Sequence, residues 1–143
     1  MPIRTAGVTL VELLIVVVVV AILASIAVPS YRSYVLRTNR VEAKTALLNL
    51  AAAQERFYLQ NNTYAANPAL ATAPPDGLGL RGTTESGHYA IVIGAASTTA
   101  FSATATAAGA QAADDACATF TINALGVKGA TDGGGSASTA CWD

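Results

Sequence analysis

Few residues in this chain of 143 could carry enzymatic chemistry. It has one histidine, two cysteines and only 12% charged residues. His88, Cys117 and Cys141 do not make a convincing zinc-binding set. The adjacent acids Asp114 and Asp115 are interpreted as a solvated turn rather than an acid–base pair, and no glycine-rich phosphate loop follows a predicted strand. We therefore expect neither an enzyme nor a site for a cofactor or metal.

The chain also lacks the surplus of basic residues that is typical of nucleic-acid-binding proteins, since its net charge is −1. The charges are unevenly distributed. Residues 31–56 include five basic and two acidic side chains, a net charge of +3, whereas residues 57–143 include two basic and six acidic ones, a net charge of −4. Those two basic residues are Arg81 and Lys128, so the C-terminal part makes a poor DNA-binding surface.

What the chain does have is a long apolar run over residues 8–28, interrupted by polar side chains only at Thr9, Glu12 and Ser25. About 20 helical residues are enough to span a bilayer, so the run predicts a membrane-spanning helix. A carboxylate within such a span costs roughly 2.5–3.5 kcal/mol and indicates a functional residue. We expect Glu12 to need a partner that the chain does not supply within the span.

The residues before this run form a very short leader, which has one basic residue, Arg4, and ends in Gly7. The apolar run follows at once, and Glu12 is its fifth residue. This arrangement resembles the N-terminal signal of type IV prepilins, in which the position of Val8 is usually phenylalanine. The resemblance implies that a prepilin peptidase cuts between Gly7 and Val8 and that Val8 is then N-methylated. It also implies that the Val8 amine pairs with Glu12 of a neighbouring subunit during assembly.

Two simpler interpretations of the run remain open at this point. An ordinary secretory signal peptide would be cut after Ala27, although its apolar region would then contain a carboxylate. A plain membrane anchor would let Glu12 snorkel to the headgroups near the membrane edge.

Helical patterning resumes after Pro29, where the helix is expected to kink or to be interrupted. Apolar residues then recur at intervals of four, three and seven on one helix face, at Ala43, Leu47, Leu50 and Phe57. The first half of the chain is therefore predicted to be one helix of roughly 50 residues, apolar all round at first and amphipathic afterwards. Because an all-round apolar helix must be buried in lipid or in other protein, a role in assembly is expected.

The sequence after the predicted helix indicates a connection followed by β-structure. Strands are expected over residues 88–93, 101–107 and 117–122, with a short fourth strand around Val127. Residues 67–87 are predicted to form an irregular connection with a turn at 74–77, and residues 133–136 a flexible loop. A disulfide between Cys117 and Cys141 would stabilise the last hairpin by about 3.5 kcal/mol. Two unrelated buried thiols are the alternative, and the resemblance to the cysteine-bounded region of pilins favours the disulfide.

The resemblance continues beyond the N-terminal signal, and it is to PilE-type pilins, in particular to minor components of type IV pili. The residues that carry it are 31–64, 117–128 and 141–142. The resemblance implies an α+β fold in which a long N-terminal helix packs on a C-terminal antiparallel sheet of about four strands. The chain then divides into a leader (1–7), a transmembrane and assembly helix (8–28), an amphipathic helix half (29–64) and a loop-and-sheet head (65–143).

The implied function is that of a structural subunit in pilus assembly, and hence in adhesion, twitching motility or DNA uptake. The implied partners are other pilin subunits, the prepilin peptidase, the inner-membrane assembly machinery and the membrane itself. The stored protein would lie in the inner membrane with a periplasmic head, and the assembled protein would be extracellular. The alternatives are a tip pilin that binds DNA or a surface, and a pseudopilin of a type II secretion system.

The charges flanking the apolar run argue against this orientation when taken alone. Three arginines, Arg32, Arg37 and Arg40, follow the run and only Arg4 precedes it, whereas basic residues usually stay on the cytoplasmic side. Long domains are translocated largely regardless of charge, however, and a disulfide would indicate an oxidising compartment. We therefore expect the head to lie outside the cytoplasm.

Overall fold

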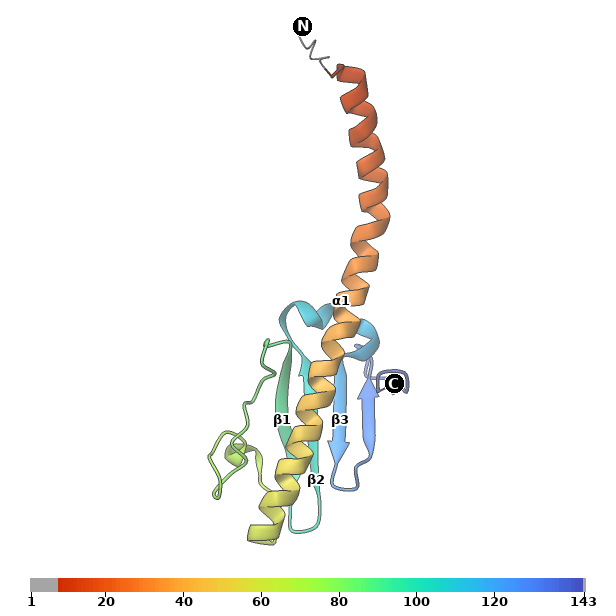
Figure 1. Ribbon diagram of the computed structural model, residues 1–143. Helices are drawn as coiled ribbons and strands as arrows, with labels where there is room; N and C mark the ends of the chain where they lie inside the picture. The colour runs from red at the N-terminus through yellow and green to blue at the C-terminus, as the bar shows by residue number, and fades with distance from the viewer. Residues whose placement is uncertain (1–7, 143) are drawn as a thin grey trace, which may run out of the picture. The chain divides into compact units, whose positions relative to one another are not determined.

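The computed structural model describes residues 8–142, so the predicted leader, including Gly7, lies outside the described residues. The chain forms two compact units, one ending at Val35 and the other beginning at Leu36. A single helix, α1 (Leu10–Asn61), contributes to both units (Figure 1). Its 52 residues agree with the predicted length, and Pro29 lies inside it without ending it.

The first unit consists of the apolar part of α1. Every residue from 8 to 34 is exposed, so none of these side chains belongs to the buried core. By length and composition this helix could cross a membrane. Pro29 has no N–H to donate to the Ser25 carbonyl. Of the two expected effects, a kink or an interruption, the interruption does not occur. Two hydroxyls near Pro29 bond other carbonyls of the helix: Ser25 donates to the Ile22 carbonyl at 2.7 Å and Ser33 to that of Pro29 at 3.1 Å.

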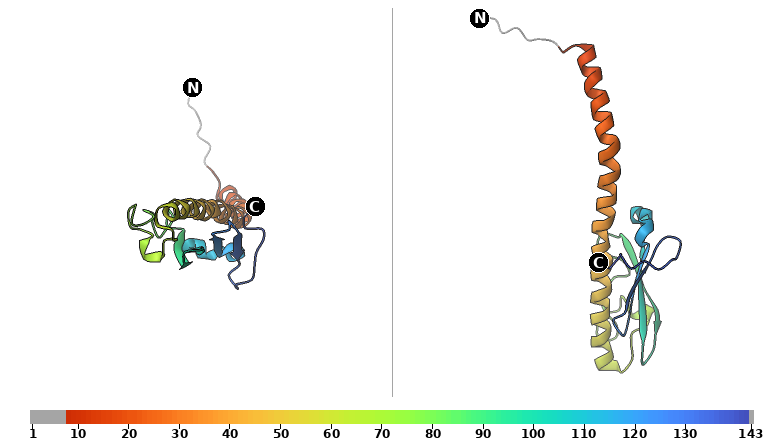
Figure 2. Two further views of the ribbon diagram at one scale, coloured as in Figure 1. Left: turned by 90° about the horizontal axis from the view of Figure 1, so that it is seen from below. Right: turned by 90° about the vertical axis from the view of Figure 1, so that its right-hand side faces the viewer.

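The second unit combines the amphipathic part of α1 with a four-stranded antiparallel sheet. The strands are β1 (Tyr89–Ala96), β2 (Phe101–Ala107), β3 (Thr119–Asn123) and β4 (Lys128–Thr131), and neighbours in sequence pair in the order β1-β2-β3-β4. Seen from below, residues 36–61 of α1 form one layer and the sheet forms the other (Figure 2). The predicted α+β fold is therefore confirmed.

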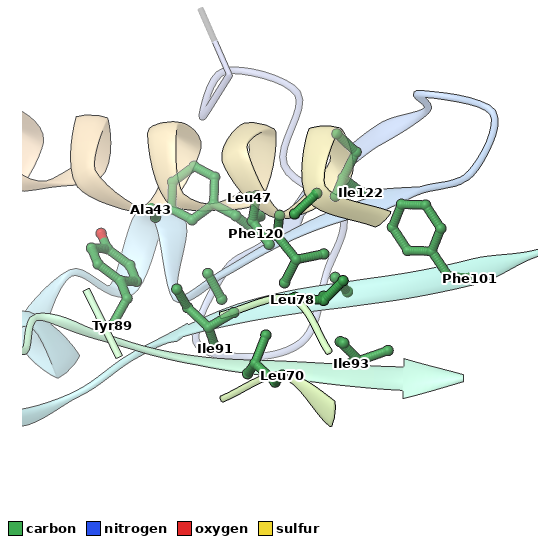
Figure 3. Packing of buried hydrophobic residues seen from close by; sticks show 14 of the residues in the cluster. Ala43, Leu47, Leu70, Leu78, Tyr89, Ile91, Ile93, Phe101, Phe120 and Ile122 are labelled. Atoms are coloured by element: carbon green, nitrogen blue, oxygen red, sulfur yellow. The ribbon is translucent and has the colours of Figure 1, made fainter. Parts of the chain in front are cut away.

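The core lies between these two layers. Ala43 and Leu47 of α1 are buried against the inward-facing residues of the sheet, as Figure 3 shows. Leu50 of α1 belongs to the same buried cluster. Alternate residues of β1 and β2 are buried, which is the pattern of strands with one face on a core. Phe57, expected on the buried face, is only half-buried and packs at the margin of this core.

The connection between α1 and β1 is mostly irregular, as predicted, with one short 3-10 helix, η1 (Asn67–Ala69), and a turn at residues 74–76. Leu70 and Leu78 reach into the core. The buried side chain of Gln54 accepts a hydrogen bond from the Ala65 N–H and donates one to the Ala65 carbonyl, both at 2.8 Å. The connection also covers the β1 edge of the sheet, because Ile91 of β1 donates to the Gly82 carbonyl at 2.8 Å. Covered edges protect a sheet from pairing with other chains.

The C-terminal segment is joined to the sheet by the predicted disulfide. Cys117 and Cys141 are bonded, with 5.8 Å between their Cα atoms, and both are buried. Cys117 ends a 3-10 turn, η3 (Asp115–Cys117), which is why β3 begins at Thr119 and not at residue 117 as predicted.

Candidate functional site

The candidate site lies at the start of α1, where Glu12 is the only charged residue between Arg4 and Arg32. Its neighbours along the helix are aliphatic and exposed: Val11 is 65% and Leu13 58% accessible. Val8, the first described residue, is 73% accessible and stands about one helical turn before Glu12. The site therefore combines one carboxylate, an apolar surface and a nearby chain position that could become an amino terminus.

Glu12 has a partner within its own chain. Its Oε2 atom accepts hydrogen bonds from the Thr9 backbone N–H and from the Thr9 hydroxyl, each at 3.2 Å. The Glu12 N–H in turn donates to the Thr9 hydroxyl oxygen at 3.2 Å. This reciprocal arrangement is a capping box, in which a threonine before the helix and a glutamate three residues later satisfy each other's backbone groups.

The expectation that the chain offers Glu12 no partner within the span is therefore wrong. The sequence contained the signal, since threonine followed three residues later by glutamate, ahead of an apolar run, is the pattern of a capping box. The bonds from Thr9 are local and neutral, however, and among residues 8–142 Glu12 forms no ion pair. An ionised carboxylate has about four lone-pair positions, so Glu12 retains the capacity to bind a cation.

A second polar cluster joins α1 to the sheet unit, and the sequence did not reveal it. The Arg40 guanidinium donates two hydrogen bonds of 2.7 Å to the two carboxylate oxygens of Asp114. Asp114 is only 4% exposed, so its interpretation as a solvated turn residue is wrong. The hydrogen bonds to Asp114 raise the pKa of Arg40, although partial burial opposes this shift. No local pattern could have paired residues 74 positions apart.

Buried polar groups complete this cluster. Gln111 donates to the Leu36 carbonyl at 3.0 Å and to the Tyr89 hydroxyl at 2.9 Å, and it accepts a bond from the Asn39 amide at 3.0 Å. Burial of Tyr89 raises its pKa to about 12, although the bond from Gln111 acts in the opposite direction. The cluster therefore fixes the start of the amphipathic part of α1 on the sheet unit, which is a structural role.

The remaining candidates from the sequence do not converge on a site. His88 lies just before β1, and Lys128 stands over the Trp142 ring at 5.2 Å. Among residues 8–142, no group of three or more His, Cys, Asp or Glu could hold a metal ion. Arg56 and Arg81 are exposed and form no ion pair within this range.

Two protein families match this chain. Residues 29–121 match the family described as type IV minor pilin ComP, DNA uptake sequence receptor. Residues 3–28 match the prokaryotic N-terminal methylation motif.

Individual relatives agree with these families. The chain is 43% identical over 61 residues to the type IV major pilin protein PilA of Myxococcus xanthus, covering 43% of this chain and 28% of that protein. It is 34% identical over 86 residues to a type IV wide pilus major component of Thermus thermophilus, covering 60% of this chain and 63% of that protein. The chain thus matches less than two thirds of the length of either relative.

The fold has a counterpart among solved structures. The crystal structure of the minor pilin PilV of Neisseria meningitidis matches 75% of this chain and 97% of its own, with a TM-score of 0.54 and 21% identity. At that identity the likeness concerns the fold alone. The family match covers most of the chain, and the resemblance drawn from the sequence is confirmed: the chain belongs to the ComP family of type IV minor pilins.

Proposed function

We propose that this chain is a structural subunit of a type IV pilus that is stored in the inner membrane and assembled into the fibre through the apolar part of α1. The observation that carries this proposal is the exposure of every residue from 8 to 34, with Glu12 as the only charge before Arg32. A helix that is apolar all round is stable only in lipid or among other helices. Storage and assembly would use these two environments in turn.

In this proposal the prepilin peptidase removes residues 1–7 and leaves Val8 with a free amine, which is then N-methylated. The head remains on the periplasmic side, and the inner-membrane machinery moves the subunit into the fibre. There Glu12 pairs with the Val8 amine of a neighbouring subunit. Pairing offsets the cost of a buried carboxylate, and Thr9 holds the Glu12 side chain near the helix start beforehand.

The test separates the charge of Glu12 from its part in the capping box. Glu12→Gln keeps an acceptor for the Thr9 groups, because glutamine also forms capping boxes, but it removes the charge. Glu12→Ala removes both. We expect both variants to be processed and to accumulate in the inner membrane, and both to be depleted from sheared pili by at least tenfold, as quantified by mass spectrometry. Normal incorporation of Glu12→Gln would overturn charge pairing as the docking mechanism.

The family description favours a second candidate function, which is DNA binding during uptake. It names a DNA uptake sequence receptor, and the matched residues 29–121 include most of the sheet unit. The charges give it little support, because only Arg81 and Lys128 are basic among residues 62–142. Duplex DNA should therefore bind the purified full chain through few phosphate contacts. We expect the affinity to depend only weakly on salt and to fall in Arg81→Gln, whereas no binding at low salt would exclude this role.

A further inference from the structure

The arginines that follow the apolar run have no part in the proposed assembly contact. Arg32, Arg37 and Arg40 come after the run, and only Arg4 comes before it. Basic residues near the end of a span favour the cytoplasmic side, so each of the three opposes export of the residues that follow. A favourable interaction of these arginines on the periplasmic side would offset their unfavourable effect on export.

Arg40 and Arg32 differ in their surroundings. Arg40 is bound to Asp114 through two hydrogen bonds of 2.7 Å, and its side chain is only 16% exposed. Its charge is therefore neutralised within the sheet unit. Arg32 is exposed and forms no ion pair with any residue from 8 to 142. Arg32 is thus a charge that an external partner can reach.

Two exposed tyrosines flank Arg32 on the same helix. Tyr31 is 69% accessible and Tyr34 is 66% accessible. Tyrosine is enriched where membranes meet water, because its ring is apolar and its hydroxyl can bond to headgroups or water. Tyrosines next to an arginine, directly after an apolar span, are therefore the residue types expected among the lipid headgroups.

The position of Arg32 along α1 also agrees with a place in the headgroup layer. The apolar run of residues 8–28 is about 31 Å long at 1.5 Å per residue, close to the thickness of roughly 30 Å of a hydrocarbon core. Arg32 lies about 6 Å beyond the end of the run, within the headgroup layer of roughly 5–7 Å on each side. Arg56 stands 24 residues further along α1 than Arg32 and belongs to the second unit.

We propose that Tyr31 and Arg32 bind the phosphate group of an anionic phospholipid at the periplasmic surface of the inner membrane. The inference rests on the proposed membrane storage with the head outside the cytoplasm. A guanidinium can donate two parallel hydrogen bonds to a phosphate, and the Tyr31 hydroxyl supplies a further donor. The contact holds the exit of the helix at the membrane surface, and it is released when the subunit leaves for the fibre.

The experiment measures lipid retention by the full chain. The protein is reconstituted in nanodiscs that contain equal amounts of phosphatidylglycerol and phosphatidylcholine, and the lipids that stay bound are counted by native mass spectrometry. We expect retained phosphatidylglycerol to exceed phosphatidylcholine about fivefold, the equivalent of about 1 kcal/mol for one arginine at an anionic surface. Arg32→Gln should abolish this preference. Arg56→Gln, which removes another exposed arginine much further along α1, should retain it.

Three outcomes would overturn the inference: no preference in the original chain, an unchanged preference in Arg32→Gln, or an equal loss in Arg56→Gln. Excess inorganic phosphate is added in a parallel sample, and displacement of the lipid by phosphate would show a site for free anions instead. Retention is measured on unassembled protein, so its failure is distinct from failure of the assembly mechanism. Loss of Glu12→Gln from sheared pili would still support charge pairing if no lipid preference were found.

Discussion

At the scale of single residues, Thr9 and Glu12 explain how a carboxylate is accommodated at the start of an apolar helix. The helix begins at Leu10, so its first N–H groups have no partner within the helix. Thr9 and Glu12 satisfy some of these groups reciprocally. A negative charge in the first turn also interacts favourably with the helix dipole, by about 0.3–1 kcal/mol at exposed sites. Glu12 therefore stabilises the isolated subunit before any pairing with a neighbour.

This local role predicts the effect of Thr9→Val, which keeps the shape of the side chain but removes its hydroxyl. Glu12 Oε2 then loses one of two donors, and the Glu12 N–H loses its acceptor. We expect the helix start to be destabilised by about 1 kcal/mol. In detergent micelles, the amides of residues 10–12 should exchange with solvent about fivefold faster. Thr9→Ser keeps the hydroxyl and should exchange at the original rate; if it frays as much as Thr9→Val, the capping box is not responsible.

Tyr89 provides a residue-scale prediction in the second unit. The pKa of this fully buried tyrosine is raised to about 12, chiefly by burial of its hydroxyl. A tyrosine whose folded pKa is raised favours folding fully below its unfolded value of about 10, and this contribution is lost as pH rises from there through 12. Absorbance at 295 nm should therefore show one tyrosine that ionises last, near pH 12. Tyr89→Phe should lose this final step, and its unfolding free energy should fall less steeply between pH 10 and 12.

At the scale of elements, the sequence predicted helices and strands well where apolar residues recur with one clear period. The apolar run and the recurrence of Ala43, Leu47 and Leu50 predicted α1, because these patterns repeat over many turns. Strict alternation predicted β2 at residues 101–107 with correct bounds. The start of β3 was placed two residues early, since nothing in the alternation distinguishes Cys117, in a 3-10 turn, from a strand residue.

The contacts between elements were harder to predict from the sequence than the elements themselves. Asp114 was interpreted as solvated together with the adjacent Asp115, because its partner Arg40 stands far away in the sequence. Gln54 lies next to the buried Ala53 on α1, and its bonds to Ala65 depend on where the chain turns after the helix. At the candidate site the bonds between Thr9 and Glu12 were also not predicted, although these residues are close in sequence and their spacing is that of a capping box.

The buried face of α1 can be tested with two neighbouring leucines. Leu47 is 0% exposed, whereas Leu48 is 45% exposed. Leu47→Ala leaves a cavity against the sheet and should lower the free energy of unfolding by about 2–5 kcal/mol. Leu48→Ala should change it by less than about 0.5 kcal/mol. Urea unfolding of the full chain in detergent can be followed by fluorescence of Trp142, the only tryptophan, which packs edge-on against Phe120. Similar losses in both variants would contradict the assigned buried face.

At the scale of the whole molecule, one helix serves two environments. Residues 8–34 are exposed to whatever surrounds them, while residues 43–54 include the buried positions that hold the sheet. The two parts differ in what they need to fold. The sheet unit has its own core and a disulfide, whereas the apolar part depends on lipid or on other subunits. The proposed route therefore requires export and processing to deliver an oxidised second unit and an intact apolar helix on the same chain.

The mass of the exported protein tests this requirement. We expect a chain that begins at Val8, carries one methyl group on its amine and has lost two hydrogens to the bond between Cys117 and Cys141. Cleavage at Gly7 keeps the whole apolar run, which assembly needs, whereas cleavage after Ala27 would remove it together with Glu12. Intact-mass measurement with and without a reducing agent distinguishes these products. A chain that begins at Val28 would identify the run as an ordinary signal peptide, and free thiols in the exported protein would contradict an oxidised second unit.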